Sequence, residues 1–261
     1  MKLSLSVAAI SAASLLSTVF AQLPFTYGAD DSGPQHWGDL NPQWEKCKSG
    51  QSQSPIDVEA EPTYVQTANG TFKYNYEPIT NAVIGFNGHS VQVDWTQPTD
   101  TNKTSWIELD DGKRYTLTQF HFHTPSEHRV NNRFADGEMH LVHSAPDNTT
   151  AVLGLFLELR ISNNPWFDWI SELDNEVDDL PSGTDTTQTK LSIESIDLPA
   201  LANATNGFAH RWTYAGSLTT PPCTEGVTWH IVKEPLQLGI EQFNALDDLQ
   251  GFNSRYIQDR P

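Results

Sequence analysis

Three histidines in two strand-like runs are the residues best suited to chemistry. His121 and His123 alternate with phenylalanines in the run QFHFH at 119–123, and His140 stands in the apolar run MHLV at 139–142. Residues i and i+2 of a strand point to the same face, so His121 and His123 point together. If the second run pairs beside the first, three imidazole nitrogens converge on one metal ion.

The ligand set predicts the kind of metal chemistry. Three protein ligands with an open fourth position are typical of catalytic zinc, whereas structural zinc usually has four protein ligands. Three neutral histidines leave the charge of the ion largely intact, so bound water becomes hydroxide near neutral pH. The pattern therefore predicts hydration or hydrolysis. Two alternatives stay open: strand histidines hydrogen-bonded in a polar face, or a smaller cupin barrel in which His121, His123 and Glu127 bind iron or manganese.

Two side chains are placed to orient these rings. Gln119 lies two residues before His121, and Glu138 two residues before His140, so each shares a strand face with a histidine. A zinc-bound histidine usually donates its other ring N–H to a carboxylate, amide or carbonyl oxygen. We therefore expect Gln119 and Glu138 to hold the two rings; a solvent-facing strand carboxylate is the alternative for Glu138.

The surrounding sequence indicates one mainly β domain at 22–261. Turn-rich pieces separate strand-like runs, which lie at 82–95, 105–109, 115–124, 138–144, 151–161, 210–216 and 227–232. Residues 165–178 favour a helix, because apolar side chains recur every three or four positions after Pro165. Residues 22–60 are rich in Pro, Gly and Trp and predict an irregular segment wrapped over the core.

Composition and the N-terminus indicate the compartment. The 261 residues include 33 acidic and 15 basic ones, for a net charge of −18, which argues against binding to nucleic acid or anionic membranes. Residues 1–21 have the pattern of a secretory signal peptide: Lys2, an apolar run and a small-residue end at Ala21. No other run is long and apolar enough to span a bilayer, so we expect a secreted, extracellular protein.

Cysteines and glycosylation sequons fit the same compartment. Cys47 and Cys223 are the two cysteines, and such a pair in a secreted chain usually forms a disulfide. Two zinc-binding thiolates are the alternative, although neither has a partner at zinc-finger spacing. Asn-x-Ser/Thr sequons, the acceptors of N-linked glycans, occur at Asn69, Asn102, Asn148 and Asn203.

Eight blocks, in order, resemble the α-class carbonic anhydrases over essentially all of the mature chain. They are GPQHW at 33–37, QSQSPI at 51–56, NGH at 87–89, QFHFH at 119–123, SEH at 126–128, EMHLVH at 138–143, GSLTTPP at 216–222 and VTW at 227–229. The resemblance implies a large, twisted, mostly antiparallel sheet of about ten strands with short peripheral helices. It also implies zinc-dependent, reversible hydration of carbon dioxide to bicarbonate and a proton. This family is itself the standard example of the three-histidine zinc site and its water pKa of about 7.

The resemblance assigns roles at the metal. His121, His123 and His140 match the zinc ligands. Thr219 matches a threonine whose hydroxyl accepts a hydrogen bond from zinc-bound hydroxide and donates one to a buried glutamate, here Glu127. Since an ionised carboxylate can only accept, it fixes the direction of the threonine proton. The hydroxide is thereby aimed at the substrate carbon.

Substrate and proton-transfer residues are implied in the same way. Thr220 matches the neighbour that contacts bicarbonate. His89, with an ordinary pKa of about 6.5, matches the histidine that passes the proton to buffer. Tyr27, Asn87 and Gln92 match positions around the water network. The apolar wall for carbon dioxide is matched by Val142, Val152, Leu218, Val227 and Trp229.

The link between His123 and Glu127 departs from the animal enzymes. It contains only residues 124–126, which resembles bacterial and plant members, so the animal pocket loop is missing and we expect a more open cone. The cysteine pair matches the disulfide of secreted members, and Pro55 and Pro222 match positions that follow cis peptide bonds.

The family resemblance also implies ligands and an alternative function. Sulfonamides and anions are expected inhibitors, activated esters are possible side substrates, and a monomer or homodimer is expected. A non-catalytic binding module on the same fold is the alternative. Such members typically lose ligand histidines, and this chain keeps all three.

Overall fold

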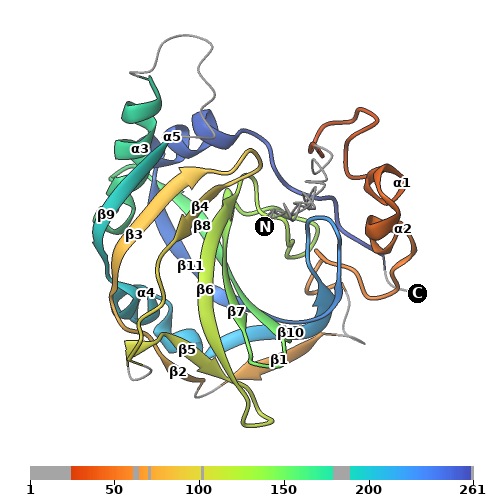
Figure 1. Cartoon of the computed structure of the whole chain (residues 1–261), viewed down its shortest axis with the longest axis horizontal. Helices are drawn as coiled ribbons and strands as arrows, with labels where there is room; N and C mark the ends of the chain where they lie inside the picture. Colours follow the sequence, from red (N-terminus) through yellow and green to blue (C-terminus); the bar gives the residue numbers. More distant parts are fainter. Residues whose placement is uncertain (1–24, 61–64, 70–71, 101–102, 179–188, 260–261) are drawn as a thin grey trace, which may run out of the picture.

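One large twisted sheet forms the body of the computed structural model (Figure 1), which describes residues 25–60, 65–69, 72–100, 103–178 and 189–259. Its strands are β1 (Gln66–Asn69), β2 (Lys73–Asn75), β3 (Ile79–Phe86), β4 (Val91–Asp94), β5 (Trp106–Glu108), β6 (Arg114–His123), β7 (Gly137–Ser144), β8 (Thr150–Arg160), β9 (Lys190–Ile196), β10 (His210–Ser217) and β11 (Glu225–Gly239).

The strand order brings β6 and β7 to the middle of the sheet. The order is β1-β10-β11-β8-β7-β6-β4-β3-β9, with β5 on β6 and β2 on β5. Strands β8 and β11 are parallel, and the other pairs are antiparallel. The predicted fold class is confirmed, with 11 strands in the sheet.

Most predicted runs match strands to within a few residues, and the main exception lies beside the site. The run predicted at 82–95 is wrong as a single strand, because it forms the hairpin of β3 and β4. The chain turns through Asn87–Ser90, where Gly88 has a φ of 92°. Glycine adopts this left-handed conformation without the penalty that a side chain would bring.

Strand alternation gives the sheet two different faces. In β7, Met139 and Leu141 join the main apolar core, which α3, α4 and α5 cover. Glu138, His140 and Val142 alternate with them in the sequence and therefore lie on the other face. That face also carries a smaller apolar cluster built largely from β8, β10 and β11.

Short helices surround the sheet. They are α1 (Trp37–Leu40), η1 (Pro42–Trp44), α2 (Lys46–Ser49), η3 (Pro165–Phe167), α3 (Asp168–Asp178), α4 (Leu198–Ala204), η5 (Asn206–Phe208) and α5 (Ile240–Gln250). The helix predicted at 165–178 is confirmed as η3 followed by α3, which lies beside α5 (Figure 1). The segment predicted to be irregular contains, from residue 25 onward, short helices, turns and an isolated β-bridge from Asp57 to Arg129, but no strand.

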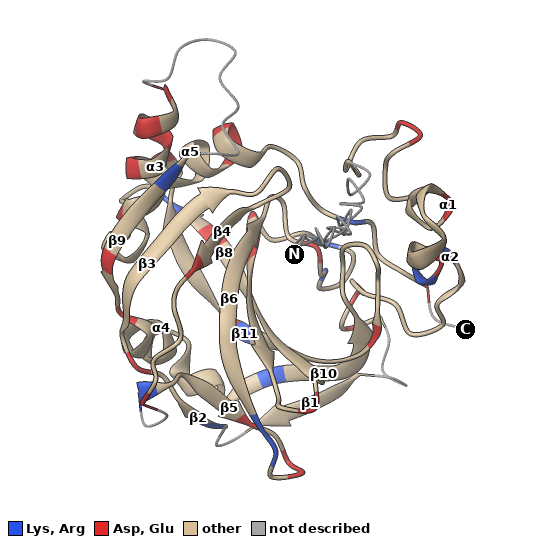
Figure 2. Cartoon of the chain, in the orientation of Figure 1, with Lys and Arg blue, Asp and Glu red and all other residues tan. Residues whose placement is uncertain are grey.

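The excess of acidic side chains lies on the outer elements, including α3 and α5 (Figure 2). Across the described ranges, we find no helix with the length and apolar character needed to cross a membrane. The predicted signal peptide at 1–21 lies outside the described residues.

Candidate metal centre

Two neighbouring strands bring the three histidines together. His121 and His123 stand at the end of β6, and His140 pairs directly with His121 across the β6–β7 ladder. The ring centroids are 4.6–5.2 Å apart. One ligand atom from each residue lies within 4.8 Å of the others. The convergence predicted from spacing is therefore present.

Each ring is fixed by a hydrogen bond on its outer nitrogen. His121 Nδ1 lies 2.9 Å from Gln119 Oε1, and His140 Nε2 lies 2.9 Å from Glu138 Oε1. His123 Nδ1 lies 2.8 Å from the main-chain oxygen of Asn253. These oxygens accept, so the outer nitrogens donate and the lone pairs of the inner nitrogens remain available.

The inner nitrogens fit a metal ion. His123 Nε2 is buried and has no hydrogen-bond partner. A buried polar atom without a partner is costly, and a metal ion satisfies a ring lone pair. Burial is the main cause that lowers the pKa of His121, well below 6.5, and the pKa of His123. Both rings are therefore neutral near pH 7, which is the form that binds metal.

Glu138 connects His140 to a second buried histidine that the sequence did not indicate. Its carboxylate accepts from His140, from His128 Nδ1 at 2.7 Å, and from the main-chain N–H groups of Glu127 and His128. Burial alone raises the pKa of Glu138, but His128 and His140 more than offset it and hold the pKa well below the usual value. His128 Nε2 continues the chain to the Tyr214 hydroxyl at 2.6 Å.

Glu127 is fully buried next to the histidines. Its Oε1 accepts from the main-chain N–H of Arg255 at 2.9 Å. Its Oε2 has no hydrogen-bond partner and lies 3.5 Å from His123 Nε2 and 4.0 Å from His140 Nδ1. Thr219 is buried, and the structure shows no hydrogen bond between it and Glu127.

The residues expected to form the carbon dioxide wall share one apolar cluster, separate from the main core. Of the five expected residues, Val142 and Leu218 are only partly buried, while the other three are buried. Trp229 also packs against the metal-site histidine His140, with ring centroids 4.8 Å apart. The expected wall residues are Val142, Val152, Leu218, Val227 and Trp229.

His89 lines the same pocket as two of the metal-site histidines. The pocket has a volume of about 200 Å³, and His89, His121, His123 and Thr220 are among its lining residues. The His89 ring stacks on Phe25, with centroids 3.7 Å apart and an interplanar angle of 10°. Burial lowers the pKa of His89 from its ordinary value.

The three residues expected around the water network also line this pocket. Asn87 donates from Nδ2 to Gln92 Oε1 at 3.1 Å, and its Oδ1 accepts from the main-chain N–H of His89. The Tyr27 hydroxyl is buried without a partner, and burial followed by the charge of Glu127 raises its pKa well above 10.

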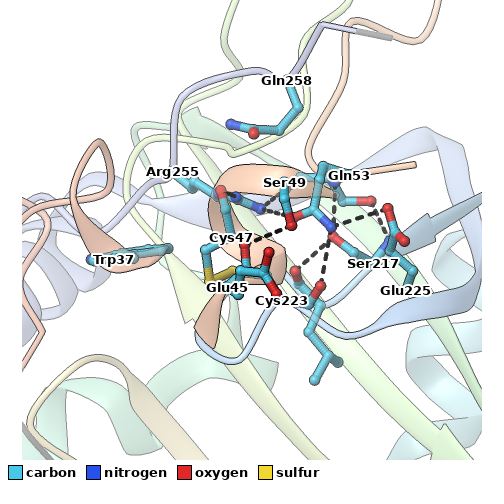
Figure 3. Close-up of a disulfide and its surroundings, with 12 residues drawn as sticks. Trp37, Glu45, Cys47, Ser49, Gln53, Ser217, Cys223, Glu225, Arg255 and Gln258 are labelled. Atoms are coloured by element: carbon cyan, nitrogen blue, oxygen red, sulfur yellow. Dashed lines mark hydrogen bonds between the residues drawn. A yellow bond between two sulfur atoms is a disulfide. The ribbon is translucent and has the colours of Figure 1, made fainter. Parts of the chain in front are cut away.

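The predicted disulfide joins the N-terminal segment to the loop that carries the threonines. The Cys47–Cys223 bond has a length of 2.04 Å (Figure 3). Gln53 donates to the main-chain oxygen of Cys223, and the buried Arg255 guanidinium donates to the main-chain oxygen of Cys47. The bonds before Pro55 and Pro222 are cis, as expected.

Comparison with known proteins identifies the family. A family model described as eukaryotic-type carbonic anhydrase matches residues 32–259. The chain belongs to the α-carbonic anhydrase family. It is 35% identical to alpha carbonic anhydrase 4 of Arabidopsis thaliana, over 93% of this chain and 85% of that protein. The carbonic anhydrase of Klebsiella pneumoniae is 36% identical, with coverages of 93% and 89%.

Solved structures of carbonic anhydrases share the fold of this chain. The fungal α-carbonic anhydrase of Aspergillus oryzae matches with a TM-score of 0.76 and 32% identity, over 90% of this chain and 93% of that one. The predicted enzyme class, a carbonic anhydrase, is confirmed by these relatives. The cupin alternative is wrong, since it requires a smaller barrel and another family.

Proposed function

We propose that the chain catalyses zinc-dependent, reversible hydration of carbon dioxide to bicarbonate and a proton. The observation that carries the proposal is the set of three buried or half-buried histidines with fixed outer nitrogens and converging inner nitrogens. His121, His123 and His140 would hold the zinc ion, which would supply hydroxide near neutral pH, a property for which this enzyme family is the standard example.

The protein's own part in the hydration step is to hold and orient the reactants. The partly exposed surfaces of Val142 and Leu218 give carbon dioxide an apolar contact beside the histidines. Glu127 Oε2 can only accept, so a hydroxyl that approaches it must donate. We assign that donor to Thr219, which leaves the threonine oxygen to orient the nucleophile, and we assign bicarbonate contact to Thr220.

Proton release is assigned to His89. The half-buried ring has a lowered pKa, so it is neutral at pH 7 and can accept a proton. It lines the same pocket as His121 and His123, and its ring is only half buried. We infer that protons reach it through water held near Asn87 and Gln92 and then pass to buffer.

We also infer secretion, glycosylation and inhibition by sulfonamides. The disulfide supports an oxidising compartment. Asn69, Asn148 and Asn203 are exposed, while Asn102 lies outside the described residues. A solved complex of the α-carbonic anhydrase of Thermovibrio ammonificans with the inhibitor sulfanilamide, 32% identical with a TM-score of 0.71, supports sulfonamide binding. A monomer or homodimer is proposed.

One relative favours a second candidate function, ligand binding without catalysis. A structure of dioscorin complexed with ascorbate matches with a TM-score of 0.71 and 26% identity, over 90% of this chain. The complete histidine set, with every outer nitrogen bonded, supports catalysis instead. Hydrolysis of activated esters would be a side activity of the same site.

Stopped-flow carbon dioxide hydration, with metal content measured on the same sample, tests the proposal. We expect fast hydration with about one zinc per chain, lost to a chelator and restored by zinc. A zinc-loaded protein without hydration activity would support the binding module. A protein that takes up no zinc would contradict the proposal.

A further inference from the structure

Asn253 contacts both the turn that carries His89 and the metal-site histidine His123, although no sequence pattern marks it. It follows α5 in the C-terminal segment and is 1% exposed. Its Nδ2 donates to the main-chain oxygens of His89 at 3.0 Å and Phe122 at 2.9 Å. Its main-chain oxygen accepts from His123 Nδ1. One residue therefore joins the turn of His89 to the strand that carries His123.

The orientation of this amide is fixed from both ends. Asn253 Oδ1 accepts from the main-chain N–H of Thr124 at 2.7 Å, while the two carbonyl oxygens require the NH₂ group on the opposite side. A flipped amide would place its oxygen against two carbonyl oxygens and its nitrogen against an N–H. The main-chain N–H of Asn253 also donates to Thr124 at 3.1 Å. The side chain is consequently locked.

We propose that Asn253 is a positioning residue that holds the His89 turn at a set distance from the metal-ligand strand. The inference rests on the proposed function, in which His89 carries the proton out. The side chain of Asn87 makes only local hydrogen bonds within this turn, because its Oδ1 accepts from the main-chain N–H groups of His89 and Ser90. The ladder between β4 and β6 begins only beyond the turn, where Gln92 pairs with His121. The Asn253 side chain attaches His89 itself to β6.

Asn253→Asp tests the proposal with almost no change in shape. An oxygen replaces the NH₂ group and faces two carbonyl oxygens, so the attachment of the turn is lost. In zinc-loaded protein, we expect kcat in weak buffer to fall about 10-fold, with rescue by imidazole and kcat/KM nearly unchanged. Asn253→Ala, which buries no charge, should behave similarly. Ser254→Ala is the matched control, since Ser254 donates to Pro125 and touches neither histidine.

A double-mutant cycle separates positioning of His89 from a general structural role. On a His89→Ala background, Asn253→Asp should give no further fall in kcat. An equal fall in both backgrounds, or an unchanged kcat in the single variant, would overturn the proposal, as would failure of both Asn253 variants to fold.

Hydrogen exchange provides a readout independent of activity. In zinc-free protein, amides of the 87–90 turn should exchange about 10-fold faster in Asn253→Asp than in wild type. Unchanged exchange would contradict the attachment itself. If the variant shows this faster exchange but the wild-type protein does not hydrate carbon dioxide, the attachment stands and only the proposed function is refuted.

Discussion

Buried histidines lie on both faces of the same sheet, and only one set is arranged to bind metal. On the site face, His121, His123 and His140 have fixed outer nitrogens and inner nitrogens that converge. On the core face, His143 Nε2 meets the Tyr76 hydroxyl at 2.9 Å, while neither ring nitrogen of His230 has a hydrogen-bond partner.

The difference shows that burial and residue type do not make a metal site. Burial lowers the pKa of His143 and His230 to about 3, so both are neutral near pH 7, like His121 and His123 of the site face. What distinguishes the site face is the set of acceptors on the outer nitrogens, because these aim three lone pairs at one point. The predictions below test this contrast.

The largest effect is expected when a ligand is removed. His121→Ala should lose zinc, and its hydration activity should fall by roughly three orders of magnitude, because the metal supplies the nucleophile at neutral pH. Metal analysis and stopped-flow hydration measure both. His230→Leu, which removes a buried histidine of the core face, is the control and should keep zinc and activity. Loss of zinc in this variant would show that the two faces do not differ in metal binding.

Removing the acceptor of His140 should weaken metal binding without removing a ligand. Glu138→Ala leaves His128 and His140 without their shared carboxylate, and we expect zinc affinity to fall 10- to 100-fold, measured by competition with a chromophoric chelator. Glu138→Gln keeps the shape but offers N–H to one donor, so it should also weaken binding. Wild-type affinity in both variants would show that the outer hydrogen bond is not required.

His89→Ala should separate proton release from hydration. Zinc content should stay at the wild-type level, while kcat in weak buffer falls about 10-fold and kcat/KM is retained. Imidazole should restore kcat, since it replaces the missing ring as a proton carrier. If added imidazole has no effect on the variant, His89 is not the proton-transfer residue.

The core-face histidines should affect the pH dependence of the free energy of unfolding rather than the hydration activity. Their pKa of about 3 in the folded state lies below the ordinary value of 6.5, so the unfolded chain binds more protons. The contribution of each neutral ring to the free energy of unfolding is therefore fully present above pH 6.5. It falls as the pH drops towards 3, by roughly 1 kcal/mol per pH unit for each histidine. Urea unfolding measured between pH 5 and 7 should show that the free energy of unfolding changes less with pH in His230→Leu than in wild type. Equal slopes would contradict the burial of a neutral ring.

The sequence predicted the parts of the site whose geometry is local. Alternation along a strand places His121 with His123 and each orienting side chain with its ring, since these residues are two positions apart. His128, Asn253 and Arg255 were not predicted. The two C-terminal residues meet the site only after more than a hundred residues of intervening chain, and no periodicity marks them.

The fold was predictable to a similar extent. Long strands such as β6, β7 and β8 were found, because β6 and β7 carry alternating apolar residues and β8 is a nearly continuous apolar run. Strands β1, β2 and β9 contain almost no fully buried residues, so they give little signal. The hairpin at 87–90 was missed, since alternation continues on both sides of Gly88, and this turn carries His89.

X-ray absorption at the zinc edge of the purified protein measures which protein groups bind the metal, which is the property that distinguishes the site face from the core face. We expect three histidine nitrogens at about 2.0–2.1 Å and one further light ligand. A carboxylate in the protein ligand set, which Glu127 is close enough to supply, or fewer than three histidines, would contradict the three-histidine site.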